Sequence, residues 1–484
     1  MKTGKVFLVG AGPGDVGLIT VKGLEAIKRA EVILYDRLAN PKLLDYADSD
    51  CELIYCGKLP DRHTLRQENI NDLLVEKALA GKIVVRLKGG DPGVFGRVGE
   101  EAAALSEYQI PFEIVPGISS GIAAPLYAGI PVTHRKHAES FAIVTAHDKS
   151  EDGKPLLDWE GLARGVDTIA FYMGVGNLPF ICENLIRHGK PSTTPVILIH
   201  WGTFGRQKTL QGTLADISEK VIESKFSNPS IILVGEVISL REKISWFEKK
   251  PLYGRQILLA RTSDSPSELA KELLAQGADV IEFPKWKVTK QPLDLKRAAD
   301  FKKIVFTSPE STAEFFAAVI EQEIDVRSLH AELFGMSSKT IKALRERGLA
   351  GKLTSEWLDS ENTLIVGGDH LLQKGFKQAE VIVTSHKELD RQFLPIFRRM
   401  LNEAHVNTII FPSSASVKPF MAAMRDCDIN AIELLNGKQV VAMGELTQAA
   451  AINAGLDSIE KPVSPSKEAL VNYLVEHRLQ GVQE

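Results

Sequence analysis

Three glycine-rich segments in the N-terminal half of the chain have the composition of a small-molecule binding site. They are VGAGPGD at 9–15, VRLKGGDPGVFGR at 85–97 and VPGISSG at 115–121, and each of them follows or closes an apolar run. Glycines at the end of a strand let a ligand approach the backbone closely. Ligands of open α/β sheets bind outside the carboxyl ends of the strands. The three segments therefore predict one binding edge, unless they are only tight turns.

Polar side chains within these segments add hydrogen-bonding groups to the expected edge. Gly89 and Gly90 come directly after a strand-like run, so their backbone amides would be open to a ligand. Asp91 adds a carboxylate that can accept a hydrogen bond from a ribose or an amine. Ser119 and Ser120 fall at an expected helix N-terminus, where serine is favoured.

The spacing argues against the two common nucleotide fingerprints. A GxGxxG dinucleotide motif would need glycine at 10, 12 and 15, but position 15 is Asp15 and Pro13 interrupts the turn. The GxxxxGK[ST] phosphate loop does not occur in the sequence. A nicotinamide-dependent oxidoreductase thus remains an alternative that this spacing disfavours.

The elements that must position these segments read as an α/β fold. Residues 5–10 read as a buried strand, 20–30 as a helix and 31–35 as a second strand, which is the pattern of a βαβ unit. Further short apolar runs separated by helical segments occur at 82–87, 112–117, 140–147, 166–173, 195–200 and 230–238.

Length and charge limit the class of protein. The 484 residues suggest about three domains. The formal net charge of −4 argues against nucleic acid as a partner. No apolar run reaches the roughly 18 residues of a membrane helix, and the N-terminus does not resemble a signal peptide, so we expect a cytoplasmic protein with no membrane partner. The four cysteines show no CxxC pair, so we expect free thiols and no metal.

The sequence predicts a domain boundary near residue 249 and contains an internal repeat beyond it. The segment 245–256 (SWFEKKPLYGRQ) interrupts two strand-like runs with charge, Pro and Gly. Beyond it, 304–319 aligns without gaps on 409–424, with seven of sixteen positions identical. The repeat predicts two similar lobes, although chance similarity between strand–helix units is the alternative.

The N-terminal half closely resembles the uroporphyrinogen-III C-methyltransferases, a class of the tetrapyrrole methylase family. The opening turn, GGDPGVFGR and PGISSGIAAPLYAGIPVTHR carry the resemblance, which covers roughly residues 4–248. It implies a domain at 1–248 with lobes at about 1–137 and 138–248. It also implies S-adenosylmethionine as cofactor, uroporphyrinogen III as a substrate that is methylated twice to precorrin-2, and a homodimer formed through this half.

The resemblance also implies roles for individual residues. Asp36 in LYDRL matches the family's proton acceptor and Lys58 in YCGK its proton donor. From the residues alone, Asp36 would be a partner of Arg37 or a helix cap. The positions that match the family's S-adenosylmethionine site are Pro13, Gly89, Gly90, Asp91, Val94, Ser119, Ser120, Met173 and Gly202.

A polycarboxylate substrate calls for cations, because arginine, lysine and histidine bind carboxylates. The candidates near the expected loops are Arg37, Arg62, His63, Arg97, His134 and Arg135.

The C-terminal half, 249–484, is the second expected domain. Its residues 254–480 resemble uroporphyrinogen-III synthase more weakly, in VFTSPESTAEFF at 305–316 and FPSSASVKPFM at 411–421. The resemblance implies a two-lobed α/β fold that closes hydroxymethylbilane to uroporphyrinogen III. Its substrate would be held at helix N-termini by Thr307, Ser308, Ser413 and Ser414, although helix capping explains each serine equally well. VIVTSHKEL at 381–389 lacks the family's tyrosine and IVGGDHLL at 365–372 its arginine, so a catalytically silent tetrapyrrole-binding module is the alternative.

Overall fold

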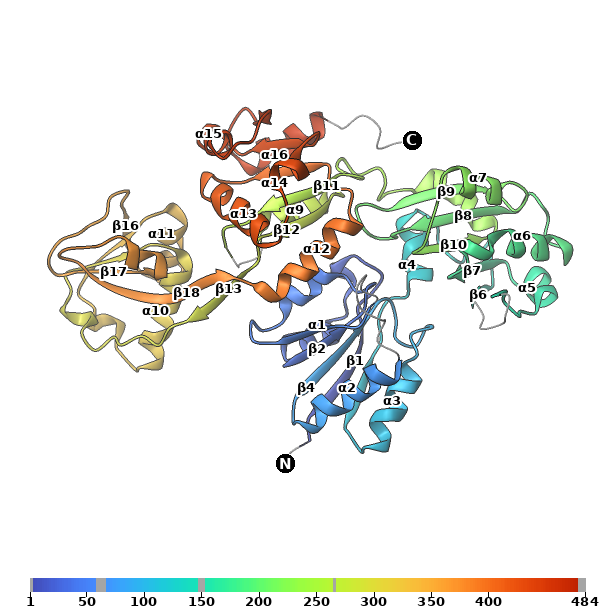
Figure 1. Cartoon of the computed structure of the whole chain (residues 1–484), viewed down its shortest axis with the longest axis horizontal. Helices are drawn as coiled ribbons and strands as arrows, with labels where there is room; N and C mark the ends of the chain where they lie inside the picture. The colour runs from blue at the N-terminus through green and yellow to red at the C-terminus, as the bar shows by residue number, and fades with distance from the viewer. Residues whose placement is uncertain (1–2, 58–66, 147–152, 264–266, 478–484) are drawn as a thin grey trace. The chain divides into compact units, whose positions relative to one another are not determined.

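The structure is a computed structural model of the chain and describes residues 3–57, 67–146, 153–263 and 267–477 (Figure 1). The chain divides into two compact units of alternating strands and helices, which confirms the expected α/β class. Unit 1 contains Met1–Arg261, Pro266–Phe283 and Leu394–Glu484, and unit 2 contains Thr262–Ser265 and Pro284–Phe393.

The first sheet of unit 1 is parallel and has the order β3-β2-β4-β1-β5. Its strands are β1 (Lys5–Gly10), β2 (Val32–Tyr35), β3 (Glu52–Tyr55), β4 (Ile83–Lys88) and β5 (Phe112–Val115). Since β4, β1 and β5 are neighbours, the three glycine-rich segments that follow them leave the sheet side by side. The sheet order thus explains how segments far apart in the sequence reach one edge.

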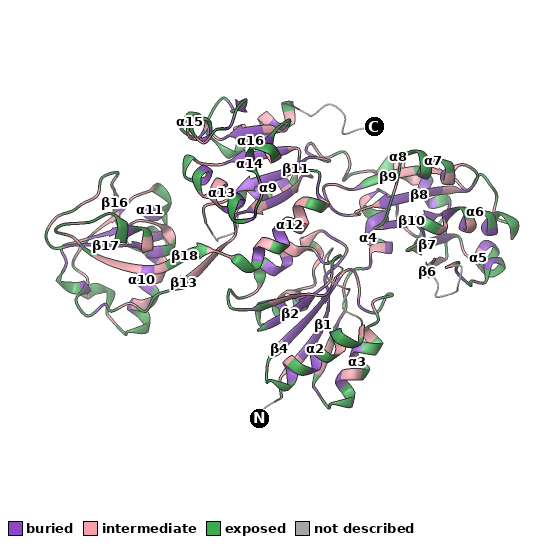
Figure 2. Ribbon diagram, viewed as in Figure 1, coloured by how far each residue is buried: buried purple, intermediate pink, exposed green. Residues whose placement is uncertain are grey.

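Helices cover this sheet on both faces. They are α1 (Val21–Lys28), the 3-10 helix η2 (Pro41–Tyr46), α2 (Gln67–Leu79) and α3 (Val98–Glu107). Thr20 begins α1 as its N-cap, because its hydroxyl accepts from the Gly23 amide. Leu74 of α2 and Leu105 of α3 pack on the apolar strand side chains, while the outer helix faces are exposed (Figure 2).

The second sheet of unit 1 is mixed and has the order β6-β7-β10-β8-β9. Its strands are β6 (Phe141–Thr145), β7 (Thr168–Tyr172), β8 (Pro195–His200), β9 (Lys208–Thr213) and β10 (Ser230–Val234). The accompanying helices are α4 (Ser120–Tyr127), α5 (Trp159–Gly165), α6 (Leu178–Arg187), α7 (Ile217–Glu223) and α8 (Arg241–Ile244). Helix α4 follows β5 in the chain but packs Ala124 against Ile197 and Ile199 of this second sheet, so it links the two lobes.

The third sheet of unit 1 belongs to the C-terminal half and is parallel, in the order β12-β11-β19-β20-β21. Its strands are β11 (Gln256–Ala260), β12 (Asp279–Phe283), β19 (Thr408–Phe411), β20 (Gln439–Ala442) and β21 (Ile459–Glu460). Its helices are α9 (Glu268–Ala275), α12 (Leu394–Glu403), α13 (Ser414–Asp426), α14 (Ala431–Leu435), α15 (Glu445–Asn453) and α16 (Lys467–Glu476).

Unit 2 is built on a six-stranded sheet in the order β13-β18-β17-β14-β15-β16. The strands are β13 (Trp286–Lys290), β14 (Lys303–Phe306), β15 (Glu332–Gly335), β16 (Gly351–Leu353), β17 (Thr363–Gly368) and β18 (Glu380–Leu389). Helices α10 (Pro309–Glu321) and α11 (Ser338–Arg345) pack on it.

The sequence repeat corresponds to one strand–turn–helix unit in each of the last two sheets. The unit β14–α10 spans 303–321 and the unit β19–α13 spans 408–426, with strands and helices of equal length. Both copies also bury the same aromatic pair. Phe306 and Phe315 lie 5.4 Å apart, ring centre to ring centre, and Phe411 and Phe420 lie 5.2 Å apart, both edge to face. The identical residues therefore form one shared packing motif.

Candidate functional site

The three glycine-rich segments meet at the carboxyl edge of the first sheet. Gly12 and Gly90 exchange backbone hydrogen bonds of 3.1 and 2.7 Å across the strand ends. A Cβ added to Gly10 would lie 2.6 Å from the Cα of Gly117, so a side chain there would force the turns apart. The glycines are thus required by the close approach of the backbones.

Gly90 leaves a space that suits a ligand. Its φ of +71° favours glycine, and a Cβ built there would find its nearest atom, the Ser120 nitrogen, 3.9 Å away. Backbone groups beside an open volume of this kind can bind a nucleoside without a phosphate loop. The residues present therefore fit S-adenosylmethionine, as the motif resemblance implies.

Asp91 ties two of the segments together. Its Oδ1 accepts from the Gly93 amide at 2.7 Å and its Oδ2 accepts from the Gly117 amide at 2.9 Å. Val94 closes the same turn through a 3.2 Å backbone bond to Asp91. Each carboxylate oxygen retains a further lone pair, so Asp91 can also accept from a ligand.

The second lobe reaches this edge through a tyrosine. Ser119 stands at the N-cap position of α4, but its hydroxyl bonds the Tyr172 hydroxyl at 2.6 Å instead of capping the helix. Tyr172 ends β7 and also accepts from the Gly121 amide at 2.5 Å. Met173 follows in the left-handed region, at φ +57°. A strained methionine beside a helix start marks a functional site better than a core position.

A second strained turn lies after β8. Trp201 and Thr203 both have positive φ values, +46° and +73°. Between them, a Cβ on Gly202 would lie 2.3 Å from the Cβ of Ala124 in α4. The Thr203 hydroxyl accepts from the Asp15 amide at 2.9 Å, which joins this turn to the first glycine-rich segment. The segments around Pro13, Met173 and Gly202 therefore converge where the two lobes meet.

Asp36 is held by a buried network of charges that the sequence did not single out. It directly follows β2, and its Oδ1 accepts from Nη2 of Arg86 at 2.6 Å. Arg86 is 2% exposed, and its Nε donates to Oε1 of Glu101 at 3.0 Å. Lys88 donates to the same oxygen at 2.7 Å, and Glu101 itself is 0% exposed. Asp36 is therefore paired with Arg86 and not with Arg37.

The two carboxylates of this network favour the charged form of Arg86. Burial alone would lower the pKa of Arg86, but Asp36 and Glu101 raise it overall. Burial and the neighbouring Arg86 lower the pKa of Lys88. Buried ions of this kind are retained only when they are paired. The signal in the sequence was the presence of Arg86 and Lys88 inside the otherwise apolar run of β4.

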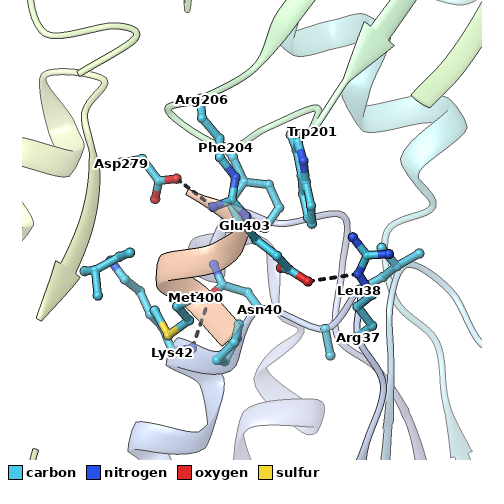
Figure 3. Close-up of a pocket in the computed structure, with 13 residues that line it drawn as sticks. Arg37, Leu38, Asn40, Lys42, Trp201, Phe204, Arg206, Asp279, Met400 and Glu403 are labelled. Atoms are coloured by element: carbon cyan, nitrogen blue, oxygen red, sulfur yellow. Dashed lines mark hydrogen bonds and ion pairs between the residues drawn. The ribbon is translucent and has the colours of Figure 1, made fainter. Parts of the chain in front are cut away.

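Arg37, the residue after Asp36, lines a pocket with residues of the C-terminal half (Figure 3). Its Nε donates to Oε1 of Glu403 in α12 at 2.9 Å. Nearby, Arg206 forms an ion pair of 3.6 Å with Asp279, and its guanidinium lies 4.2 Å from the ring centre of Trp201. The lining residues are Arg37, Leu38, Ala39, Asn40, Pro41, Lys42, Trp201, Phe204, Arg206, Asp279, Ile281, Met400 and Glu403.

The expected proton donor Lys58 and the other expected substrate-binding residues of this half are placed as follows. Lys58, Arg62 and His63 lie outside the described residues. Arg97 pairs with Glu100 at 2.5 Å, and His134 belongs to a turn that also carries the exposed Arg135. In the part of the chain that the structure describes, no hydrogen bond or ion pair links Arg97, His134 or Arg135 to Asp36. Their roles remain predictions.

The serines of the C-terminal half differ between the two copies of the repeat. The Ser308 hydroxyl caps α10 by accepting from the Ser311 amide at 3.0 Å. Ser413 occupies the equivalent position before α13, but its hydroxyl makes no capping bond, and Ser414 is exposed. The Thr307 hydroxyl is buried and has no partner among the described residues. Capping therefore accounts for Ser308, whereas Ser413 and Thr307 retain hydroxyls for other contacts.

Among the described residues, no helix is long and apolar enough to cross a membrane. In the same part of the chain, no group of three or more His, Cys, Asp and Glu side chains is placed to hold a metal ion. All four cysteines are free and buried.

Comparison with known proteins gives two family matches along the chain. The family of Tetrapyrrole (Corrin/Porphyrin) Methylases matches residues 5–218, and the family of Uroporphyrinogen-III synthase HemD matches residues 267–472. A Uroporphyrinogen-III C-methyltransferase of Bacillus subtilis is 51% identical over 86% of this chain and 87% of its own length. One of Priestia megaterium is 62% identical over 49% of this chain and 99% of its own length. The Porphyrin biosynthesis protein HemD of Ruminiclostridium josui is 35% identical over 93% of this chain and 94% of its own length.

Proposed function

This chain belongs to the uroporphyrinogen-III C-methyltransferases of the tetrapyrrole methylase family, and from that premise we propose that its N-terminal half methylates uroporphyrinogen III twice to give precorrin-2. S-adenosylmethionine, when bound, supplies an electrophilic methyl group to a pyrrole carbon. The observation that carries the proposal is Asp36, which Arg86 holds at 2.6 Å beside the glycine-rich edge of the same sheet.

We assign some residues of the site to cofactor binding and others to proton transfer. Gly90 leaves room for the cofactor, the neighbouring turns bind it through their backbones, and Met173 and Gly202 close the site from the second lobe. Asp36 takes the proton that the methylated macrocycle loses, because the hydrogen bond from the buried Arg86 holds its carboxylate in a fixed orientation. Lys58 donates a proton, as the family resemblance implies.

The substrate is a polycarboxylate, and Arg37 is the cation best placed to bind it. It lies one residue from Asp36 and is half exposed at a pocket mouth. The planar guanidinium of arginine matches a carboxylate better than an ammonium does. A substrate arm bound there would keep the macrocycle within reach of Asp36.

We propose that the C-terminal half, 249–484, closes hydroxymethylbilane to uroporphyrinogen III and so supplies the methylase. The match to the synthase family and the hydroxyls of Ser413 and Thr307 support this activity. The alternative is a catalytically silent tetrapyrrole-binding module, which the missing tyrosine at 381–389 and the missing arginine at 365–372 favour.

One experiment tests both halves. The full chain is incubated with hydroxymethylbilane, with and without S-adenosylmethionine, and the products are identified by mass and by isomer. We expect the rearranged isomer III without the cofactor and its dimethylated form with it. Only the unrearranged isomer would refute the synthase assignment, and no methylation of added uroporphyrinogen III would refute the methylase assignment.

We further propose a cytoplasmic homodimer joined through the methylase half. The four buried, free cysteines support a reducing compartment. Exposed apolar side chains on and near α4, namely Ile122, Leu126 and Trp246, support a self-association surface. Light scattering on the purified chain measures the mass, and a monomer at micromolar concentration would contradict the dimer.

A further inference from the structure

Helix α12 belongs to the C-terminal half of the sequence but presents one face to the methylase site. Arg399 and Glu403 are spaced i, i+4 and Met400 and Glu403 are spaced i, i+3, so Glu403 is a surface neighbour of both along the helix. Met400 and Glu403 line the pocket of Figure 3 together with the segment that follows β2. The ion pair between Glu403 and Arg37, at 2.9 Å, fixes this face against that segment.

Arg399 lies over the ends of the two strands that lead to the predicted catalytic residues. Its guanidinium carbon is 4.5 Å from the ring centre of Tyr55 and 5.6 Å from that of Tyr35. Tyr35 ends β2 directly before Asp36, and Tyr55 ends β3 three residues before Lys58. Burial raises the pKa of Tyr35 to about 12, and Arg399 partly opposes that rise. A cation from the C-terminal half therefore sits beside the proposed proton-transfer site.

Two donor nitrogens of Arg399 lack an acceptor within the part of the chain that the structure describes. Its Nε and Nη2 are buried and have no hydrogen-bond partner among the described residues. Buried donors without acceptors are costly and are rare in native proteins. The acidic group one turn further along the same face, Glu403, is already engaged by Arg37. These two donors are therefore available to an acceptor on a bound ligand.

We propose that Arg399 is a substrate-binding residue of the methylase site, where it binds a carboxylate arm of the tetrapyrrole. The inference rests on the proposed function, since it takes the polycarboxylate substrate from there. A carboxylate is the chemical group that fits, because it accepts two parallel bonds from the guanidinium fork. Arg37 and Arg399 then provide two cationic contacts for the substrate, one from each half of the chain.

The test measures binding directly and does not depend on turnover. The probe is uroporphyrin III, the oxidised macrocycle that keeps the carboxylate arms, and its fluorescence is followed as the full chain is added. We expect Arg399→Met to raise the Kd of uroporphyrin III about ten-fold, the effect of losing one charge-assisted contact. Arg398→Met is the matched control, since Arg398 is the adjacent, exposed arginine and pairs with Asp428.

The outcomes separate binding from a purely structural role. If Arg399 only stacks on the two tyrosines, Arg399→Met lowers the melting temperature and leaves the Kd unchanged, which overturns the proposal. If that variant does not fold, the Kd of Arg399→Lys tests the proposal instead. Lysine keeps the positive charge but lacks the two parallel donors of the guanidinium. A Kd unchanged in Arg399→Lys then overturns the proposal, and a several-fold rise supports it. Failure of the proposed function would appear separately, as wild-type chain that binds the probe but does not methylate uroporphyrinogen III.

Discussion

Replacing Arg86 by lysine should separate the two carboxylates that this side chain joins. The guanidinium reaches Asp36 with Nη2 at 2.6 Å and Glu101 with Nε at 3.0 Å. A single ammonium cannot make both contacts, so Arg86→Lys loses one charge-assisted hydrogen bond. Such a bond contributes about 1.5–3 kcal/mol to stability. Faster hydrogen–deuterium exchange in peptides from β2 and β4 would report the loss.

The same substitution should slow methylation, because Asp36 no longer has a fixed orientation. A misplaced catalytic group commonly costs up to about 100-fold in rate, so we expect kcat to fall by about 10- to 100-fold. Binding of S-adenosylhomocysteine, measured by calorimetric titration, should not change. Arg164→Lys is the control, since Arg164 pairs with Glu160 on the exposed surface of α5.

A double-mutant cycle tests whether Arg86 acts through Asp36. We expect Asp36→Asn alone to lower the rate by about 10²–10⁴, the range for general acid–base groups. In that background Arg86→Lys should have almost no further effect on the rate, because the two residues act as a unit. Additive effects on the rate would refute this reasoning and would assign Arg86 a separate role.

Three further predictions follow from other parts of the chain. Gly90→Ala should weaken S-adenosylhomocysteine binding at least ten-fold in a calorimetric titration, because its Cβ enters the open space at the glycine-rich edge. Gly375 is the control position, since it has a similar φ of +64° and open surroundings. Gly375→Ala should carry the same backbone strain and bind S-adenosylhomocysteine as tightly as the wild type. Burial lowers the pKa of His200 below 6.5, so the unfolded chain takes up the proton at a higher pH than the folded chain. The free energy of unfolding therefore falls as the pH drops through 6.5, by at most about 1.4 kcal/mol per pH unit. The melting temperature of His200→Asn should fall less between pH 7 and 5 than that of the wild type, and parallel curves would contradict this. Ser308→Ala should lower the free energy of unfolding of unit 2 by about 1 kcal/mol, because the helix cap is lost. Ser413→Ala should leave the free energy of unfolding in urea unchanged and should slow ring closure. Equal effects of the two variants on unfolding would show that both serines are only caps.

The strands and the glycine-rich edge could be predicted from the sequence because their signals are local. The run at 5–10 is β1, and the runs at 82–87 and 195–200 correspond to β4 and β8 within one residue. The family resemblance is confirmed over both halves. Short apolar runs closed by glycine leave few alternatives to a buried strand.

The charge network and the contacts of α12 could not be predicted in the same way. Arginine and glutamate are usually surface residues, and only the packing of α3 on β4 brings Arg86 and Glu101 together inside the lobe. Arg37 and Glu403 are far apart in the sequence, and charged residues are too common for such a pairing to be recognised. The partner of Asp36 could not be predicted for the same reason. The sequence favours the adjacent Arg37, whereas the structure shows the more distant Arg86.

The third sheet of unit 1 has a consequence for how the chain is made. Its central pairing joins Ile257 of β11 to Thr408 of β19, and all of unit 2 is synthesised between them. During synthesis on the ribosome, the edge of β11 that pairs with β19 therefore stays unpaired until residues beyond 411 have emerged. Pairing over such a separation is slow, and an unpaired edge is prone to aggregate. A chain released early, before α12 and β19, would expose that edge and become a substrate for chaperones and proteases, while the N-terminal lobes would already be complete.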